Sequence, residues 1–195
     1  MSTLEVKELS HPTGEVLKIA AGKTLDLKSQ GTTTLPTGSV LQVISAIKTD
    51  TFSVSVNNGY HDVTGLSLAI TPSSTSSKIL MQVNISVTSN ERYAGVRLRR
   101  GSTDIAFGDA DGIRQQVTVG VDSNQDETHN IHVMRNSSAS YLDSPNTTSA
   151  TTYKVQVGNI HSTNAIIYVN RVPSSDNGNY NIRGVSTITL MEIAG

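Results

Sequence analysis

Residues 79–88 read ILMQVNISVT, a stretch in which an apolar side chain occupies every odd-numbered position. In an extended chain Ile79, Met81 and Val83 point to one side, whereas Gln82 and Asn84 point to the other. This period of two is the pattern of a strand with one buried face and one face in water, which is typical of antiparallel sheets.

The same pattern extends on both sides of this stretch. It recurs at residues 66–70 and 152–157, and further strands are predicted at 40–48, 51–56, 60–63, 94–99, 103–107, 115–121, 130–136, 166–171 and 185–193. Asn58-Gly59 between two apolar runs predicts a two-residue hairpin, and Gly101-Ser102 separates two further strands. The sequence therefore predicts an all-β fold, namely an antiparallel β-sandwich of the jelly-roll type.

Composition supports this fold and excludes several classes of protein. Ser and Thr make up 48 of the 195 residues and charged residues only 16%, which excludes a coiled coil or a helical bundle. The net charge of −1 leaves no basic excess for nucleic acid. No Cys is present, so disulfides and zinc–thiolate sites are excluded. No stretch approaches the roughly 18 apolar residues of a membrane span, and the N-terminus does not have the pattern of a signal peptide.

The first 38 residues differ from the rest. Short apolar pairs, Leu17 with Ile19 and Leu25 with Leu27, repeat eight residues apart between turns. Such small rungs cannot enclose a core within one chain, and in the absence of Cys the expected help is association with other chains. We therefore expect residues 1–38 to form a β-rung anchor or shaft and residues 39–195 to form the jelly-roll head. The alternative is a loose tail that becomes ordered only on its host.

Several segments resemble small tail-fibre-like and structural virion proteins of marine bacteriophages. They are KTDTFS at 48–53, DVTGL at 62–66, ITPSSTSSKIL at 70–80, LDSP at 142–145, TSATTYKVQ at 148–156 and STITLMEI at 186–193. The resemblance covers residues 40–195 and implies a trimeric appendage whose C-terminal domain is shaped like the C1q and tumour-necrosis-factor jelly rolls. It does not imply a ligand or a position on the virion. A homotrimer is also expected on physical grounds, because the short rungs of three chains wound together would complete each other's edge hydrogen bonds.

No constellation of residues indicates catalysis, a metal or a cofactor. Glu127, His129 and His132 form the densest titratable group, but His132 would lie on the opposite face of a strand from the other two. Asp109 and Asp111, followed by Gly112, resemble the start of a calcium loop that lacks its closing Glu, so a turn explains them better. Neither a nucleophile elbow nor a phosphate-binding loop is present. We expect no enzyme and no metal site.

Two sets of residues are candidates for binding. Arg97 and Arg99 share one face of a predicted strand and would grip anionic groups such as phosphates, unless they form a solvated or subunit-contact face balanced by Asp104, Asp109 and Asp111. The loops at 58–61, 121–130 and 172–184 would lie on a rigid sandwich, where recognition is usually found. Because Tyr and Asn suit glycans, the candidate surface-ligand residues in these loops are Tyr60, His61, Asp176, Asn177 and Tyr180.

These observations favour a virion structural protein, assembled in the host cytoplasm, that forms a homotrimeric fibre or spike. Residues 1–38 would bind another virion protein, and the head would contact the host surface, with a glycan as its candidate ligand. The alternative is a capsid-decorating or head-fibre protein, which the short N-terminal segment favours. A more distant alternative is a bacterial lectin-like adhesion module, against which the missing signal sequence counts.

Overall fold

The computed structural model describes residues 21–22, 35–57, 59–91, 93–122, 132–160 and 164–195. These residues form eleven strands, which are β1 (Val40–Lys48), β2 (Phe52–Val56), β3 (Gly59–Ile70), β4 (Lys78–Ser89), β5 (Tyr93–Arg100), β6 (Thr103–Ile105), β7 (Val119–Asp122), β8 (Arg135–Asp143), β9 (Thr151–Asn159), β10 (Ala165–Val169) and β11 (Ser186–Ile193). All of them belong to the unit Leu35–Gly195, one of two into which the chain divides. None of the described residues belongs to a helix long and apolar enough to cross a membrane.

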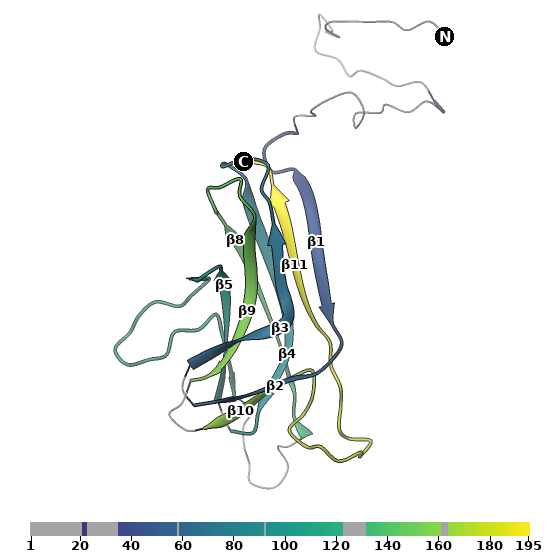
Figure 1. Cartoon of the computed structure of the whole chain (residues 1–195), viewed down its shortest axis with the longest axis vertical. Coiled ribbons are helices and arrows are strands. Elements are labelled where there is room, and N and C mark those ends of the chain that lie inside the picture. Colours follow the sequence, from purple (N-terminus) through teal and green to yellow (C-terminus); the bar gives the residue numbers. More distant parts are fainter. Residues whose placement is uncertain (1–20, 23–34, 58, 92, 123–131, 161–163) are drawn as a thin grey trace, which may run out of the picture. The chain divides into compact units, whose positions relative to one another are not determined.

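The strands pair into two antiparallel sheets (Figure 1). Sheet A has the order β1-β11-β4-β10-β2, with β8 also paired to β4. Sheet B has the order β3-β9-β5-β6, with β7 also paired to β5. The chain crosses from one sheet to the other between β2 and β3, β3 and β4, β4 and β5, β7 and β8, β8 and β9, and β9 and β10. This crossing pattern is that of a jelly roll, so the predicted antiparallel β-sandwich is confirmed.

The core lies between the two sheets, and the alternation in β4 builds one wall of it. Every odd-numbered residue from Ile79 to Val87 is buried, and each fully buried aliphatic side chain contributes about 1.5–3 kcal/mol. Sheet B supplies the opposite wall from β5 and β9, through Ala94, Val96, Leu98, Tyr153, Val155 and Val157. Gln82 and Asn84, between the core positions of β4, are exposed on the outer surface of sheet A, whereas Ser86 of β4 and Gln156 of β9 are buried.

Of the two predicted turns, one is wrong and one is confirmed. Asn58-Gly59 does not close a hairpin, because β2 pairs with β10 in sheet A whereas β3 pairs with β9 in sheet B. The chain crosses between the sheets at this point, and Gly59 has a positive φ of 123°. β5 and β6 do form the expected hairpin, in which Arg100 pairs with Thr103 and Gly101 has a φ of 56°.

The predicted strand at 130–136 is displaced, because the observed strand β8 spans 135–143 and residues 123–131 lie outside the described part of the chain. β8 pairs with β4 from Val87 to Ile79, and its inward side chains include Ala139 and Tyr141. Two other strands are shorter than expected. β6 ends at Ile105 because Ala106 adopts a positive φ of 51°, and β7 begins only at 119.

Both ends of the described sandwich lie at the same end of the fold. The backbone amide of Gly38 donates to the carbonyl oxygen of Ala194 at 2.8 Å, and the amide of Ala194 donates to Ser39 at 2.8 Å. The sandwich therefore includes the residues from 38 onward. The predicted rungs in residues 1–34 lie outside the described residues, apart from the turn at 21–22.

Candidate functional site

The connection between β10 and β11, residues 170–185, is a long loop that is closed at its base. Asn170, which is buried and has a φ of 61°, ends β10 and accepts a backbone hydrogen bond from Gly184 at 3.1 Å. Arg171 forms an isolated bridge with Arg183, and its guanidinium donates to the carbonyls of residues 172–174. These contacts hold the loop in one shape without regular secondary structure.

Asp176 organises the outer half of this loop. The hydroxyl of Tyr180 donates to Oδ2 of Asp176 at 2.9 Å, and the hydroxyl of Ser174 donates to Oδ1. The side-chain amide of Asn181 donates to the backbone carbonyl of Asp176 at 2.9 Å and to its carboxylate. The hydrogen bonds from Ser174 and Tyr180 hold the pKa of Asp176 below its usual value, so this side chain carries a fixed negative charge.

Tyr180 presents its ring to solvent although its orientation is fixed. The side chain is 53% exposed, while one part of the ring packs against Gly178, where a Cβ would come within 2.8 Å of it. The hydrogen bond to Asp176 raises the pKa of Tyr180 and keeps the phenol neutral. An exposed, oriented aromatic ring is a suitable platform for the apolar face of a sugar.

His132 supports this ring from another part of the chain. Its imidazole meets the ring of Tyr180 edge to face, with centroids 4.5 Å apart, and its Nδ1 lies 2.7 Å from Oδ1 of Asn181. The sequence reasoning grouped His132 with Glu127 and His129 instead. Those two residues lie outside the described part of the chain, so that grouping stays a prediction.

A small polar hollow of about 170 Å³ opens beside Asp176. This volume is below the roughly 300–1,000 Å³ of ligand pockets for drug-sized molecules, so the hollow suits one small polar group. Carboxylate, amide and guanidinium groups give it both donors and acceptors. Its lining residues are Val172, Ser174, Asp176, Asn177, Gly178, Asn181, Ile182 and Arg183.

Tyr60 and His61 belong to strand β3, which agrees with the strand predicted at 60–63 and corrects their placement in a loop at 58–61. The ring of Tyr60 is half-buried and lies over Gly158, and the guanidinium carbon of Arg97 is 3.6 Å from its centroid. Burial raises the pKa of the Tyr60 hydroxyl. The ring is therefore covered on one face by Arg97 and is not a free platform like that of Tyr180. His61 is exposed and pairs with Val157.

Arg97 and Arg99 lie side by side on the outer surface of sheet B and share one carboxylate. Nε of Arg99 is 2.9 Å from Oδ1 of Asp104, and Nη1 of Arg97 is 3.9 Å from its Oδ2. The guanidinium of Arg97 also contacts the rings of Tyr60 and Phe107. An external anion would have to compete with Asp104 for these arginines, so their role as anion contacts stays a prediction.

The segment of Asp109, Asp111 and Gly112 is a turn, as expected. The amide of Arg114 donates to the carbonyl of Asp111 at 3.1 Å, Gly112 has a φ of 56°, and the side chains of Asp111 and Arg114 form an ion pair. Among the described residues, no three His, Asp or Glu side chains gather as a metal site would require.

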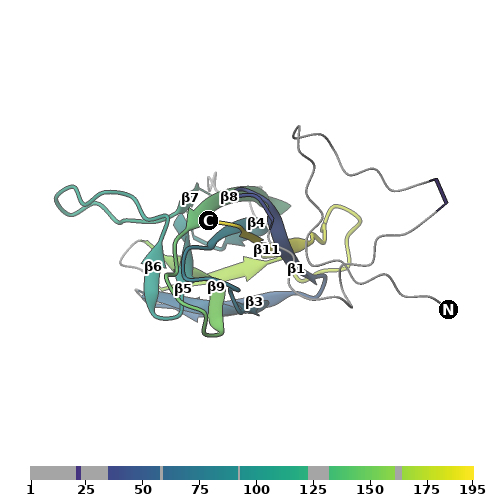
Figure 2. The same ribbon diagram turned by 90° about the horizontal axis from the view of Figure 1, so that it is seen from above.

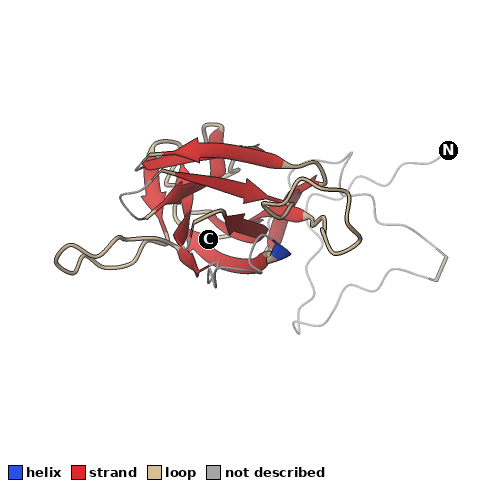
Figure 3. Cartoon of the chain, turned by 90° about the horizontal axis from the view of Figure 1, so that it is seen from below, coloured by secondary structure: helices blue, strands red, loops and turns tan. Residues whose placement is uncertain are grey.

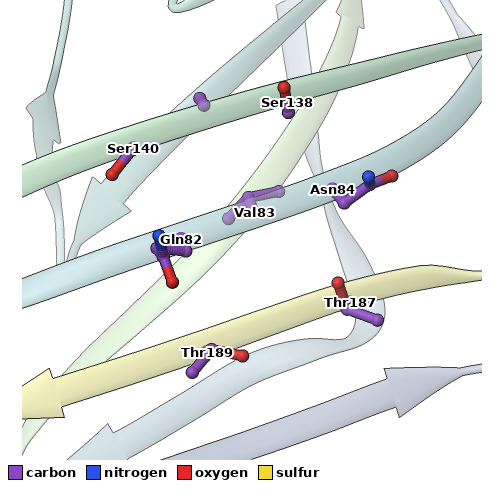
Figure 4. A pocket seen from close by; sticks show the side chains of 8 residues that line it. Gln82, Val83, Asn84, Ser138, Ser140, Thr187 and Thr189 are labelled. Atoms are coloured by element: carbon purple, nitrogen blue, oxygen red, sulfur yellow. The ribbon is translucent and has the colours of Figure 1, made fainter.

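The outer surface of sheet A carries a second hollow that sequence reasoning did not single out (Figure 4). It has a volume of about 350 Å³ and runs across β8, β4 and β11, where residues with small or uncharged polar side chains lie in register. Exposed apolar side chains of Val43, Ile47 and Leu142 also occur on the strands of this sheet. The lining residues are Gln82, Val83, Asn84, Ser138, Ala139, Ser140, Thr187 and Thr189.

The fold and the closed loop define the molecule as a jelly-roll protein with a polar loop site at one end. No protein-family model matches the chain, and no curated protein matches it. One solved structure, that of infectious bursal disease virus Gx strain, contains a chain with a TM-score of 0.37 and 11% sequence identity. The match covers 88% of this chain but only 41% of that chain. At this score and identity, the similarity identifies neither a family nor a function.

Proposed function

We propose that the chain is a non-enzymatic structural protein of a bacteriophage virion, and that it forms a homotrimeric fibre or spike. In this role the segment preceding Leu35 binds another virion protein, and the loop at 170–185 contacts a glycan on the host surface. One observation carries the proposal: the ends of the sandwich chain and the loop lie at opposite ends of the fold.

The register of β1 and β11 fixes this arrangement. Val40 pairs with Ile193 at one end of the sandwich, and Lys48 pairs with Ser186 at the other. Leu35 and Gly195 therefore belong to the first end and the loop belongs to the second (Figure 1). An adhesive head needs this separation, because anchoring at one end leaves the other free to reach a cell.

The chemistry of the loop supports a sugar as the ligand. Tyr180 offers an oriented ring, Asp176 and Asn177 offer groups that bond to hydroxyls, and the hollow holds one small polar group. A site of this size binds weakly in a single copy. Three copies on one particle raise the overall avidity by about 10²–10⁴-fold without any new contact.

Competition for host cells tests the adhesive role. We expect full-length protein, added before the virus, to reduce adsorption, and Tyr180→Ala to lose this effect because the ring platform is gone. Leu35→Ala is the matched control, since it removes an exposed apolar side chain at the opposite end. If the natural protein does not compete, the adhesive role is wrong. If Tyr180→Ala competes as well as the natural protein, the loop at 170–185 is not the contact.

The second candidate function is decoration of the capsid, which the same anchored architecture serves. Immunogold electron microscopy of particles of the virus that encodes the chain separates the two. Gold at the tail supports the fibre, gold spread over the shell supports decoration, and particles without gold contradict both.

A further inference from the structure

The loop at 170–185 carries one charged side chain that has no partner among the described residues. Arg183 is exposed and lines the polar hollow of about 170 Å³ beside Asp176. Its bridge with Arg171 joins backbone groups, and within the part of the chain that the structure describes no hydrogen bond or ion pair involves its guanidinium. The loop extends beyond the strands to one side of the sandwich (Figures 2 and 3), so this guanidinium is open to a ligand from solvent.

The other charged side chains of this loop already have partners. The carboxylate of Asp176 accepts three side-chain hydrogen bonds from within the loop, and Arg171 donates to the carbonyls of residues 172–174. No ion pair within the described loop joins Asp176 to Arg183, although both residues line the hollow. Two arginines and one aspartate give residues 170–185 a net charge of +1 at neutral pH. Arg183 is therefore the charged group whose hydrogen-bonding capacity is left for a ligand.

A guanidinium favours anions of a particular shape. Its N–H donors form a planar fork that fits two oxygens of a carboxylate or a phosphate. Such charge-assisted hydrogen bonds are about twice as strong as those between neutral groups. The hollow is small enough to hold one group of this kind. An anionic substituent of a ligand is therefore the group that fits Arg183 best.

The hollow lies next to the exposed ring of Tyr180. Asp176 lines the hollow, and its Oδ2 accepts the hydrogen bond from the Tyr180 hydroxyl at 2.9 Å. Gly178 also lines the hollow, and it packs against the ring itself. A sugar that stacks on Tyr180 can therefore place one of its substituents in the hollow.

We propose that the loop binds a sugar with one anionic group, a carboxylate or a phosphate. Tyr180 packs against the apolar face of the sugar ring, and Arg183 binds the anionic group in the hollow. The charge of Asp176 repels a further anionic group, so the site takes a sugar that carries only one. This inference rests on the proposed adhesive function and names the class of glycan that the loop contacts.

Three methyl glycosides that differ only at C6 test this preference. Methyl glucoside, methyl glucuronide and methyl glucoside 6-phosphate carry a hydroxyl, a carboxylate and a phosphate there, and NMR titration of the full-length chain measures the Kd of each. We expect the two anionic sugars to bind on the order of 10-fold more tightly than the neutral one, and less so as salt is added. The tighter of the two identifies the preferred anion. Equal binding of neutral and anionic sugars would overturn the inference.

Substitution of Arg183 tests whether this side chain causes the preference. We expect Arg183→Gln to bind the neutral sugar as the natural chain does, because Tyr180 remains, but to lose the preference for anionic sugars. Arg114→Gln is the matched control, since it removes an exposed arginine from the connection between β6 and β7. Circular dichroism checks that both variants keep the fold. If Arg183→Gln keeps the preference, or if Arg114→Gln loses it too, the assignment to Arg183 is wrong.

These measurements separate the class of glycan from the adhesive function itself. A natural chain that reduces virus adsorption but binds neutral and anionic sugars equally contradicts the anionic sugar and leaves the adhesive function standing. Binding of none of the three sugars also contradicts the anionic sugar. A natural chain that does not reduce adsorption contradicts the adhesive function, whatever sugar the loop binds.

Discussion

Asn170 joins the ends of β1, β10 and β11 through the hydrogen bonds of its side chain. Its side-chain amide donates to the carbonyls of Lys48 at 2.8 Å and Asp50 at 3.0 Å, and its Oδ1 accepts from the hydroxyl of Ser186 at 2.6 Å. We expect Asn170→Ala to lower the free energy of unfolding by about 1–3 kcal/mol, since buried partners lose their hydrogen bonds and the positive φ disfavours Ala. Urea unfolding measures this. Asn177→Ala, in the exposed loop, is the control, and an equal loss there would contradict the argument.

The carboxylate of Glu192 makes the free energy of unfolding depend on pH in the acid range. Burial would raise the pKa of this carboxyl, but hydrogen bonds from Ser73 (amide 2.7 Å, hydroxyl 2.6 Å) and Gln42 (2.5 Å) outweigh it and lower the pKa. A group whose pKa is lower in the folded state contributes stability above its unfolded pKa, about 4.3 for Glu, and loses it as the pH falls through the folded value. We expect Glu192→Gln to be less stable than the natural chain at neutral pH. The difference between the two free energies of unfolding should become smaller in acid.

Urea unfolding of both chains at neutral pH and at several acid values checks this prediction. Other carboxylates titrate in the same range, so the informative quantity is the difference between the two unfolding free energies. A difference that stays constant down to the lowest pH would show that the lost hydrogen bonds matter and the charge of Glu192 does not.

At the scale of elements, glycines let strands of sheet B accept a large ring. A Cβ on Gly158 of β9 would meet the carbonyl oxygen of Gly59 and come within 2.8 Å of the Tyr60 ring. We expect Gly158→Ala to cost about 1–3 kcal/mol of stability through overpacking. Gly120→Ala in β7 is the matched control, because the nearest atom there would be 3.9 Å away. Thermal and urea unfolding measure the stability of both variants. A Gly158→Ala variant as stable as Gly120→Ala would contradict this packing.

Strands with an alternating apolar pattern in their own residues could be predicted from the sequence. Strands that lack this pattern and form by pairing with a distant strand could not. The alternation in β4 and β9 identifies the core directly, because each buried position is itself apolar. β8 was misplaced because its inward positions include Ser137 beside Ala139 and Tyr141. Its strand character comes from pairing with β4, far earlier in the chain, where Val87 pairs with Arg135 and Ile79 with Asp143. The Asn58-Gly59 hairpin failed for the same reason, since the partners of β2 and β3 lie far along the chain.

The residues of the candidate site also divide into those that could be predicted from the sequence and those that could not. Asp176, Asn177 and Tyr180 could be chosen because a long polar loop with one Tyr is visible in the sequence. His132 and Asn181 could not be joined, because 49 residues separate them and only the folded loop brings them to 2.7 Å. Tyr60 looked equivalent to Tyr180 by composition, but its strand turns it toward Arg97.

At the scale of the molecule, the two sheets and the core between them lie within one unit, Leu35–Gly195. The buried core runs from Val56 to Leu190, and hydrogen bonds tie the segment at Gly38 to Ala194. We therefore expect a chain of residues 35–195 to unfold cooperatively with a β-rich circular dichroism spectrum. A chain that also lacks β1 is the control, and it should unfold more readily because β11 loses the strand that covers its edge.

The mass of this shortened chain tests which segment would hold the proposed homotrimer together. The repeated apolar pairs that favour a homotrimer lie within residues 1–38, so we expect light scattering to find a single copy once residues 1–34 are removed. Three copies associated without residues 1–34 would instead assign the threefold contact to the sandwich.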